Sequence, residues 1–360
     1  MLSNLKKLPC YAIGSALVIS FTLFFYLYAP VPQTAPPPKV ELSHPETTTI
    51  EISTASAIIT TSTVTSHQSL PTNKEDLPSD HVYQIPDKVW HSAKLDNLTD
   101  NQRGWIGSWT KTNPYCRQEL LTDRSAEAFV RSHFHKTRPD IVEIYEALPI
   151  AILRADFLRY LIVLAEGGIW GDLDVTCEKD VAEWVPLEYR NNTIDMIVGL
   201  EFDIAWRGPG TGIASQFCNW VFVGRKSSRN LQVVVDAVVA KLKEIALTNN
   251  VAISGLTLEM LSDVVDVTGP KMMTIAILNS LTKLLGRPVD DRDFAGTKRP
   301  KLVGDVLIMP GNAFAANQNN HPTDQGDILA THHYEGSWKK EDAEAKERKK
   351  LKQHPPPTTE

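Results

Sequence analysis

The stretch RADFLRYLIVLAEGGIWGDLDVTC, residues 154–177, joins a mostly apolar helical pattern to a short apolar strand that finishes in two aspartates. Gly167 and Gly168 indicate the helix C-cap and a sharp turn into the strand. Residues two apart in a strand point to one face, so Asp172 and Asp174 can present both carboxylates together. Two close like charges repel unless a cation lies between them, and Mg²⁺ or Mn²⁺ binds carboxylate oxygens together with substrate phosphates. The stretch therefore predicts a metal and diphosphate site at a strand end.

An Asp-x-Asp pair is a weak signal by itself, because this spacing arises by chance in most chains of this length and then usually marks a solvated turn. The preceding helix adds context, since it carries Arg154, Asp156 and Arg159 beside apolar positions that would pack on a sheet. Unpaired buried charge is expensive, so these groups need partners. Asp156 and Arg159 are i,i+3 neighbours, and a purely structural ion pair is the alternative to a role in a site.

Residues 82–338 alternate expected strands with expected helices. This alternation predicts an α/β domain with a mainly parallel sheet flanked by helices. The strand candidates are KVWHSA, CRQELLT, GIWGDLDV, DMIVGLEF, CNWVFVGR, GDVLIMPG and DILATHHY. The helix candidates are 99–114, 123–134, 149–168, 230–246 and a last helix after VTGPKMM.

The first thirty residues predict a membrane anchor. Lys6 and Lys7 precede the uncharged apolar run Cys10–Ala29, which is long enough to cross a hydrocarbon core of about 30 Å as a helix. A cleaved signal peptide is the alternative, but its apolar region is usually only about 7 to 15 residues. Positive charge on the N-terminal side predicts a type II orientation, with a cytoplasmic tail at 1–7 and the anchor at 8–29.

Two further segments differ in composition from the folded region. Residues 30–81 are rich in Pro, Ser and Thr and predict a disordered stem that holds the domain away from the membrane. Residues 339–360 form a charge run closed by prolines and predict a charged disordered tail, with a solvated helix as the alternative and a binding element disfavoured. The 360-residue chain has a net charge of −6, so we expect no nucleic-acid partner.

A lumenal location has consequences for cysteines and glycans. Cys116, Cys177 and Cys218 permit at most one internal disulfide, and their spacing does not choose the pair. The sequons at Asn97 and Asn191 would be accessible to N-glycosylation.

The ordered set of motifs resembles the glycosyltransferases with a DXD sugar-binding region and a GT-A (Rossmann-like) fold, in particular fungal initiation-specific α-1,6-mannosyltransferase-like proteins. The blocks that carry the resemblance are IPDKVWHS, SWTKTNPYCRQELLTDRSAEAFV, RADFLRYLIVLAEGGIWGDLD, VGLEFD, VTGP and THHYEGSWK. The resemblance implies retaining, metal-dependent transfer of mannose from GDP-mannose to an N-linked glycan in the Golgi lumen, by a single-pass type II membrane protein. It also implies Mn²⁺ or Mg²⁺ as cofactor and leaves a homo- or hetero-oligomer open.

The resemblance also assigns roles to the site residues. Asp174 would be the main metal ligand, and Asp172 would contact the donor ribose or the metal. His332 would be a further ligand, and His333 is a near-equal candidate because neighbours on a strand face opposite ways. Trp90 would lie near the base, and Glu201 and Asp203 would face the reacting sugar, where a carboxylate stabilises an oxocarbenium-like carbon. The remaining donor-binding candidates are Arg154, Asp156, Arg159, Gly167, Gly168, Ser337 and Trp338.

The chain departs from the usual pattern of these proteins at three places. Trp170 replaces a more usual tyrosine, WHSAK replaces Trp-Gln-Thr, and Val175 replaces Thr. Two alternatives stay open: a relative that uses another donor or a glycolipid acceptor, and a lumenal glycan-binding protein without turnover.

Overall fold

The computed structural model describes residues 85, 87–95, 97–204, 213–316, 318, 324–336 and 339–353. All of them belong to one compact unit, Thr72–Glu360. The predicted cytoplasmic tail, anchor and stem, as well as Ser337 and Trp338, lie outside the described residues. Among the described helices, none combines the length and the apolar character that a bilayer span requires.

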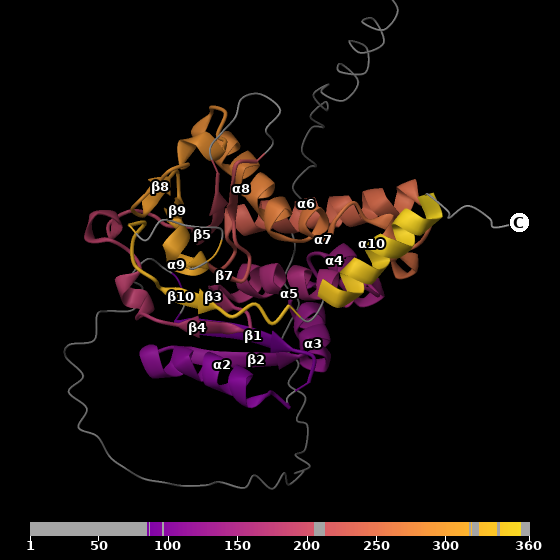
Figure 1. The fold of residues 1–360 in the computed structure, drawn as a ribbon, viewed down its shortest axis with the longest axis horizontal. Coiled ribbons are helices and arrows are strands. Elements are labelled where there is room, and N and C mark those ends of the chain that lie inside the picture. The colour runs from indigo at the N-terminus through magenta and orange to yellow at the C-terminus, as the bar shows by residue number, and fades with distance from the viewer. Residues whose placement is uncertain are drawn as a thin grey trace, which may run out of the picture. The chain divides into compact units, whose positions relative to one another are not determined.

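A central eight-stranded sheet has the order β2-β1-β3-β7-β5-β9-β8, with β6 paired to β5 (Figure 1). Strand β1 is parallel to β2 and β3, and β5 is parallel to β9, whereas β7 is antiparallel to both β3 and β5 and β8 is antiparallel to β9. The predicted α/β class with a mainly parallel sheet flanked by helices is confirmed, in that β1, β2, β3, β5 and β9 run in one direction whereas β6, β7 and β8 run in the other. The strands are β1 (Lys88–Ala93), β2 (Arg117–Thr122), β3 (Gly168–Gly171), β5 (Met196–Asp203), β6 (Ser215–Phe217), β7 (Val221–Gly224), β8 (Lys301–Val303) and β9 (Val306–Met309).

Both faces of this sheet are covered, because neighbouring residues of β1 and of β3 enter different cores. Trp90, Trp170 and Phe222 belong to a core with the helices α3, α4, α5, α6 and α8. Their neighbours Val89 and Ile169 belong to a second core, with Trp109 of α2 and Phe314 of α9. The helices are α2 (Asp100–Thr112), α3 (Asp123–Phe134), α4 (Pro139–Ala147), α5 (Ala151–Glu166), α6 (Arg229–Thr248), α7 (Val264–Val267), α8 (Pro270–Leu285) and α9 (Gly311–Ala315).

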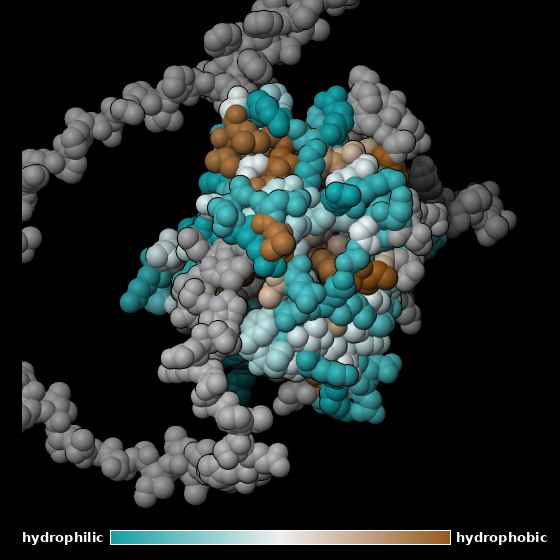
Figure 2. All heavy atoms as spheres, turned by 90° about the vertical axis from the view of Figure 1, so that its left-hand side faces the viewer, coloured by the Kyte–Doolittle hydropathy of each residue, from teal (hydrophilic) through white to brown (hydrophobic). Residues whose placement is uncertain are grey.

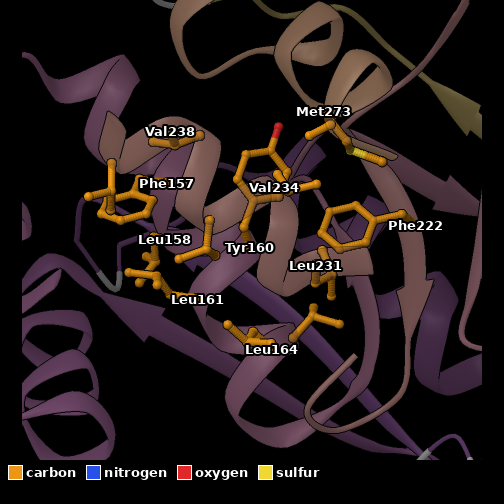
Figure 3. Packing of buried hydrophobic residues seen from close by; sticks show 14 of the residues in the cluster. Phe157, Leu158, Tyr160, Leu161, Leu164, Phe222, Leu231, Val234, Val238 and Met273 are labelled. Atoms are coloured by element: carbon orange, nitrogen blue, oxygen red, sulfur yellow. The ribbon is translucent and has the colours of Figure 1, made fainter. Parts of the chain in front are cut away.

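Helix α5 is the centre of the first core. Phe157 and Tyr160 on α5 pack in one apolar cluster with Phe222 of β7 and Val234 of α6 (Figure 3). A helix that is apolar on nearly all sides is stable only when it is buried all round, and burial of each large apolar side chain contributes about 1.5 to 3 kcal/mol. The helix therefore provides a fixed support for the polar groups that it carries.

The outer surface differs from these cores. The face of the molecule in Figure 2 is largely hydrophilic, with separate apolar patches. The exposed large apolar side chains include Leu187 after β4 and Leu247 on α6, and three lie on α8, namely Ile275, Leu284 and Leu285. Scattered single residues of this kind are usual on soluble domains.

The DXD motif departs from the expected single strand. The sequence GIWGDLDV divides into β3 and the short strand β4 (Val175–Cys177), and Asp172 to Asp174 form the turn between them. The backbone N–H of Val175 donates to the carbonyl of Asp172 at 3.2 Å and closes this turn. Strand β4 pairs with β10 (Ala330–His332) in a separate antiparallel sheet, in which His332 lies opposite Val175. This pairing brings the end of the described domain to the motif.

The prediction of a disordered tail is wrong for the first part of this segment, because Lys339–Gln353 form helix α10. Ala345 is buried, Arg348 Nε lies 2.7 Å from a Glu259 carboxylate oxygen, and Lys346 Nζ lies 3.0 Å from Asp263 Oδ2. The acidic partners belong to the segment between α6 and α8, which includes the short 3₁₀ turns Ile253–Gly255 and Leu258–Met260. The charge run gains order from these distant partners, which its own composition does not reveal.

Candidate active site

A cavity of about 360 Å³ opens at the carboxyl end of β3. Its wall includes side chains from α5, the β3–β4 turn, β5, the segment before β7 and the segment after β10. Because β7 runs antiparallel to its neighbours, the residues before its start lie at the same edge as the ends of β3 and β5. Ligands of open α/β sheets bind at such an edge.

Three potential metal ligands meet in this cavity. Asp172, Asp174 and His332 each offer a ligand atom, and these atoms lie within 4.8 Å of one another. His332 Nε2 is 3.2 Å from Asp174 Oδ2, while the buried Nδ1 of His332 has no hydrogen-bond partner among the described residues. Two carboxylates and one imidazole form a donor set that suits a divalent cation. The residues present therefore fit a metal ion, and the donor set does not specify which one.

Arg159 supports this cluster from helix α5. Its side chain is 7% exposed, and its guanidinium lies 2.9 Å from Asp156 Oδ1 and 3.2 Å from Asp172 Oδ1. It also donates to the carbonyl of Asn219 at 2.9 Å. Burial works to lower the pKa of Arg159, but Asp172 and Asp156 outweigh it and raise this pKa, so the guanidinium stays charged. The Asp156–Arg159 pair is both structural and part of the site.

Three further hydrogen bonds fix the positions of Asp156 and Asp172. Asp156 accepts hydrogen bonds from Thr268 Oγ1 at 2.9 Å and from Asn219 Nδ2 at 3.1 Å. Asp172 accepts one from Trp170 Nε1 at 2.7 Å. The indole N–H of Trp170, which replaces a more usual tyrosine, thus orients the first carboxylate of the motif.

The two carboxylates of the motif have different environments. Burial raises the pKa of Asp172, and the charge of Asp174 raises it further against the opposing effect of Arg159. Burial also acts to raise the pKa of Asp174, but the hydrogen bond with His332 and the backbone N–H of Glu335 outweigh it and lower this pKa. A bound cation would favour the ionised form of both.

The structure distinguishes between the two histidines. His332 faces Asp174 in the cavity, as described above. His333 is exposed, stacks on Trp105 of α2 with ring centroids 4.5 Å apart, and has Nε2 2.7 Å from Thr176 Oγ1. Only its backbone N–H approaches the motif, through a 2.8 Å hydrogen bond to the carbonyl of Asp174. His332 is therefore the metal-ligand candidate.

The structure also distinguishes between the two predicted carboxylates of β5. Glu201 lines the cavity and accepts a hydrogen bond from Gln216 Nε2 at 2.8 Å, and burial raises its pKa. Asp203 is not among the cavity residues; it accepts from Ser215 Oγ at 2.6 Å and from the backbone N–H of Gly296 at 2.7 Å. Asp203 is placed to connect β5 to its neighbouring segments, so Glu201 alone of the two faces the cavity.

Arg154 lies outside the cavity, contrary to the prediction. Its guanidinium is 3.3 Å from Asp123 Oδ2 and 3.5 Å from Glu127 Oε1, both on α3. Arg154 and Arg159 are five residues apart on α5, which places them on different sides of the helix. Arg154 therefore connects two helices rather than ordering a donor pocket.

Trp90, Gly167 and Gly168 also lie away from the cavity. Trp90 is buried in the first core, and its Nε1 donates to the carbonyl of Gly167 at 2.9 Å. Gly168 has φ +109°, and a Cβ there would lie 2.6 Å from the carbonyl oxygen of Lys88. Both glycines lie at the start of β3, whereas the cavity is at its other end, so they permit the close turn from α5 into the sheet.

Several residues of the cavity were missed from the sequence. Trp220 stacks on His332 with ring centroids 4.5 Å apart, Tyr334 lies 3.8 Å from the same ring, and Asn219 supports Asp156. Gln102 of α2 donates to Glu335 at 3.0 Å and lines the cavity. The polar and aromatic Asn219-Trp220 pair directly before the apolar run VFVG was the signal that could have been used.

The predicted cysteines and sequon asparagines differ in exposure. Cys116, Cys177 and Cys218 are buried free thiols. Asn97 and Asn191, the two sequon asparagines, are both exposed.

Part of this site lies in a stretch that matches a known protein family. Residues 99–191 match the family model described as glycosyltransferase sugar-binding region containing DXD motif. The chain is 28% identical over 279 residues to the initiation-specific alpha-1,6-mannosyltransferase of Schizosaccharomyces pombe, covering 76% of this chain and 68% of that protein. It is 27% identical over 293 residues to the protein of the same description from Candida albicans, covering 73% and 74%. These matches confirm the resemblance inferred from the motifs.

Among solved structures, the chain has a distant match to PaToxG glycosyltransferase. The similarity covers 56% of this chain and 71% of that one, with 17% sequence identity and a TM-score of 0.38.

Proposed function

We propose that this chain, which is a glycosyltransferase with a DXD-type sugar-binding region, transfers mannose from GDP-mannose to an N-linked glycan. The finer parts of the proposal are a GT-A-like catalytic domain, an α-1,6 linkage, retention of configuration and a requirement for Mn²⁺ or Mg²⁺. The names of the two mannosyltransferase relatives support the transferred sugar and the linkage. The observation that carries the proposal is the cluster of Asp172, Asp174 and His332 in the cavity.

The site can stabilise the charge that such a reaction develops. A divalent cation held by Asp172, Asp174 and His332 would supply positive charge opposite the departing diphosphate. Arg159 holds the carboxylate of Asp172 in place. Lys339, at the start of α10, adds a second positive side chain to the cavity wall.

In this proposal, Glu201 is the residue that faces the transferred sugar. Glu201 presents a carboxyl group to the cavity, where a negative charge stabilises the oxocarbenium-like carbon of the transferred sugar. Retention of configuration would follow if the acceptor hydroxyl attacks on the face that the diphosphate leaves and gives its proton to a phosphate oxygen. In this scheme Glu201 replaces Asp203 as the carboxylate nearest the reaction.

The test is the release of GDP from GDP-mannose by the purified full chain in mild detergent, with and without Mn²⁺ and a high-mannose N-glycan. The expected result is metal-dependent release that rises with the glycan, with the linkage identified by product analysis. Asp174→Asn should abolish release, and the matched control Asp236→Asn, an exposed carboxylate on α6, should not. Release from UDP-sugars alone would refute the proposed donor, and transfer only to a glycolipid would refute the proposed acceptor.

We also propose that residues 8–29 anchor the chain in the Golgi membrane with the catalytic domain in the lumen, beyond the stem at 30–81. The apolar run with Lys6 and Lys7 before it supports this topology. Because Asn97 and Asn191 are exposed, either can receive a glycan if the domain is lumenal. A glycosidase-sensitive mass shift that disappears in the Asn97→Gln, Asn191→Gln double variant would support the topology, and protease digestion of the domain in sealed vesicles would refute it.

A further inference from the structure

The segment His333–Gly336 crosses the cavity next to the DXD motif. The backbone N–H groups of His333 and Glu335 donate to the carbonyl oxygen and to Oδ2 of Asp174, at 2.8 and 3.0 Å. Between them, Tyr334 has φ +56°, a left-handed conformation that is costly for a residue with a bulky side chain. Backbone strain of this kind persists where the surroundings hold it, and it is concentrated at functional sites.

Three neighbours fix the ring of Tyr334. Its centroid lies 3.8 Å from that of His332 and 5.7 Å from that of Trp220, the latter in an edge-to-face arrangement. Lys339 Nζ lies 5.8 Å from the ring centroid. The position of the phenol oxygen is therefore determined by the ring packing, which a phenylalanine would preserve.

The hydroxyl of Tyr334 is buried, and it has no hydrogen-bond partner among the residues that the structure describes. Buried polar groups are almost always paired, so this hydroxyl needs an explanation. A phenol hydroxyl ordinarily carries its proton at neutral pH, so that of Tyr334 is available as a hydrogen-bond donor.

Glu201 provides the complementary function in the same cavity. Its carboxyl group accepts from Gln216, and each carboxyl oxygen can accept more than one hydrogen bond. A sugar hydroxyl donates one hydrogen bond and accepts up to two. Tyr334 and Glu201 both line the cavity, and a donor and an acceptor there match the hydroxyl groups of a hexose.

We propose that Tyr334 determines donor specificity by donating a hydrogen bond to one hydroxyl of the transferred hexose, while Glu201 accepts from the hexose beside it. This inference rests on the proposed function and identifies the residue that recognises the sugar rather than the nucleotide. A site built to pair with a substrate hydroxyl discriminates strongly against analogues that lack it, because its buried polar group is then left unpaired.

The test combines a protein variant with altered donors. Tyr334→Phe and the matched control Tyr189→Phe, which removes a phenol oxygen outside the cavity, are compared with the unmodified chain on GDP-mannose and its 2-, 3-, 4- and 6-deoxy analogues. On GDP-mannose, we expect Tyr334→Phe to lower kcat/KM roughly 10- to 100-fold and Tyr189→Phe to leave it unchanged. One deoxy analogue should have a low kcat/KM with the unmodified chain, and the kcat/KM for that analogue should not fall further in Tyr334→Phe.

A uniform loss on all five donors, or no loss on GDP-mannose, would overturn the inference, because Tyr334 would then only position His332 or have no role. If the unmodified chain prefers another nucleotide sugar, the proposed donor is wrong, and the deoxy series of that sugar tests Tyr334 in the same way.

If no donor is turned over, calorimetric binding of GDP-mannose and GDP decides instead. Weaker binding of GDP-mannose with unchanged binding of GDP in Tyr334→Phe supports the inference. Equal weakening of both ligands refutes it.

Discussion

Acidification should destabilise the domain through His91, a buried histidine on β1. His91 Nδ1 is 2.7 Å from the carbonyl of Gly171, and Nε2 is 2.8 Å from the amide nitrogen of Gln118, which donates to the carbonyl of Ile106. These partners assign the neutral tautomer with the proton on Nδ1. Burial lowers the pKa of His91 from 6.5 to about 4, although the hydrogen bond to Gly171 acts in the opposite direction.

The sign and size of the effect follow from this shift. Between pH 6.5 and about 4 the unfolded chain binds a proton at His91 that the folded chain does not, so stability falls as the pH falls through this range. One pKa unit corresponds to about 1.4 kcal/mol, so the loss is about 2 kcal/mol at pH 5 and about 3 kcal/mol below pH 4. Above pH 7 the contribution is negligible.

The assay is urea unfolding of the full chain at pH 7.5, 6.0 and 5.0, compared with His91→Asn, whose amide can still donate to Gly171. Other titrating groups contribute equally to both proteins, so the difference isolates His91. The unmodified protein should lose about 2 kcal/mol more than the variant between pH 7.5 and 5.0. Parallel stability curves for the two proteins would refute the reasoning.

Three further predictions concern the motif, its support and a close contact in the sheet. Asp174→Asn should reduce Mn²⁺ binding and lower turnover at least roughly 100-fold while leaving the unfolding midpoint nearly unchanged, as calorimetry and urea titration would show. Asp156→Ala should cost about 3 to 5 kcal/mol of unfolding free energy, because it leaves Arg159 buried with one carboxylate fewer; a loss under about 1 kcal/mol would contradict this. Gly199→Ala places a Cβ 2.3 Å from Phe314 Cδ2 and should cost about 1 to 3 kcal/mol in the same assay, with partial recovery when Phe314→Leu is added.

The parts of the fold that follow local rules could be predicted from the sequence. Thr99 and Gln102 form the capping box that begins α2, and the glycines after α5 end it where the pattern indicated. The DXD motif and His332 were assigned by resemblance, and the structure places them together. Local patterns are sufficient for the helix ends, because neighbours in the sequence determine them, whereas the assignment of His332 depended on the resemblance.

The rest depends on contacts between distant segments. Arg154 and Arg159 share one helix, and only the position of α3 shows that Arg154 faces Asp123 rather than the cavity. In the sequence, Asp203 and Glu201 are equally good candidates for a carboxylate in the site. Only the structure shows that Asp203 accepts hydrogen bonds from Ser215 of β6 and from Gly296. No pattern within VGLEFD contains that information.

The pairing of β4 with β10 has a consequence for biosynthesis. Three residue pairs set the register of β4 and β10. A slip by one residue would put a neighbour of His332 opposite Val175 and would turn the side chain of His332 to the other face of the sheet. The chain therefore acquires its third metal-ligand candidate only when nearly the whole domain has been synthesised. Prematurely terminated products that end before Ala330 would therefore carry the two aspartates of the cluster without its histidine.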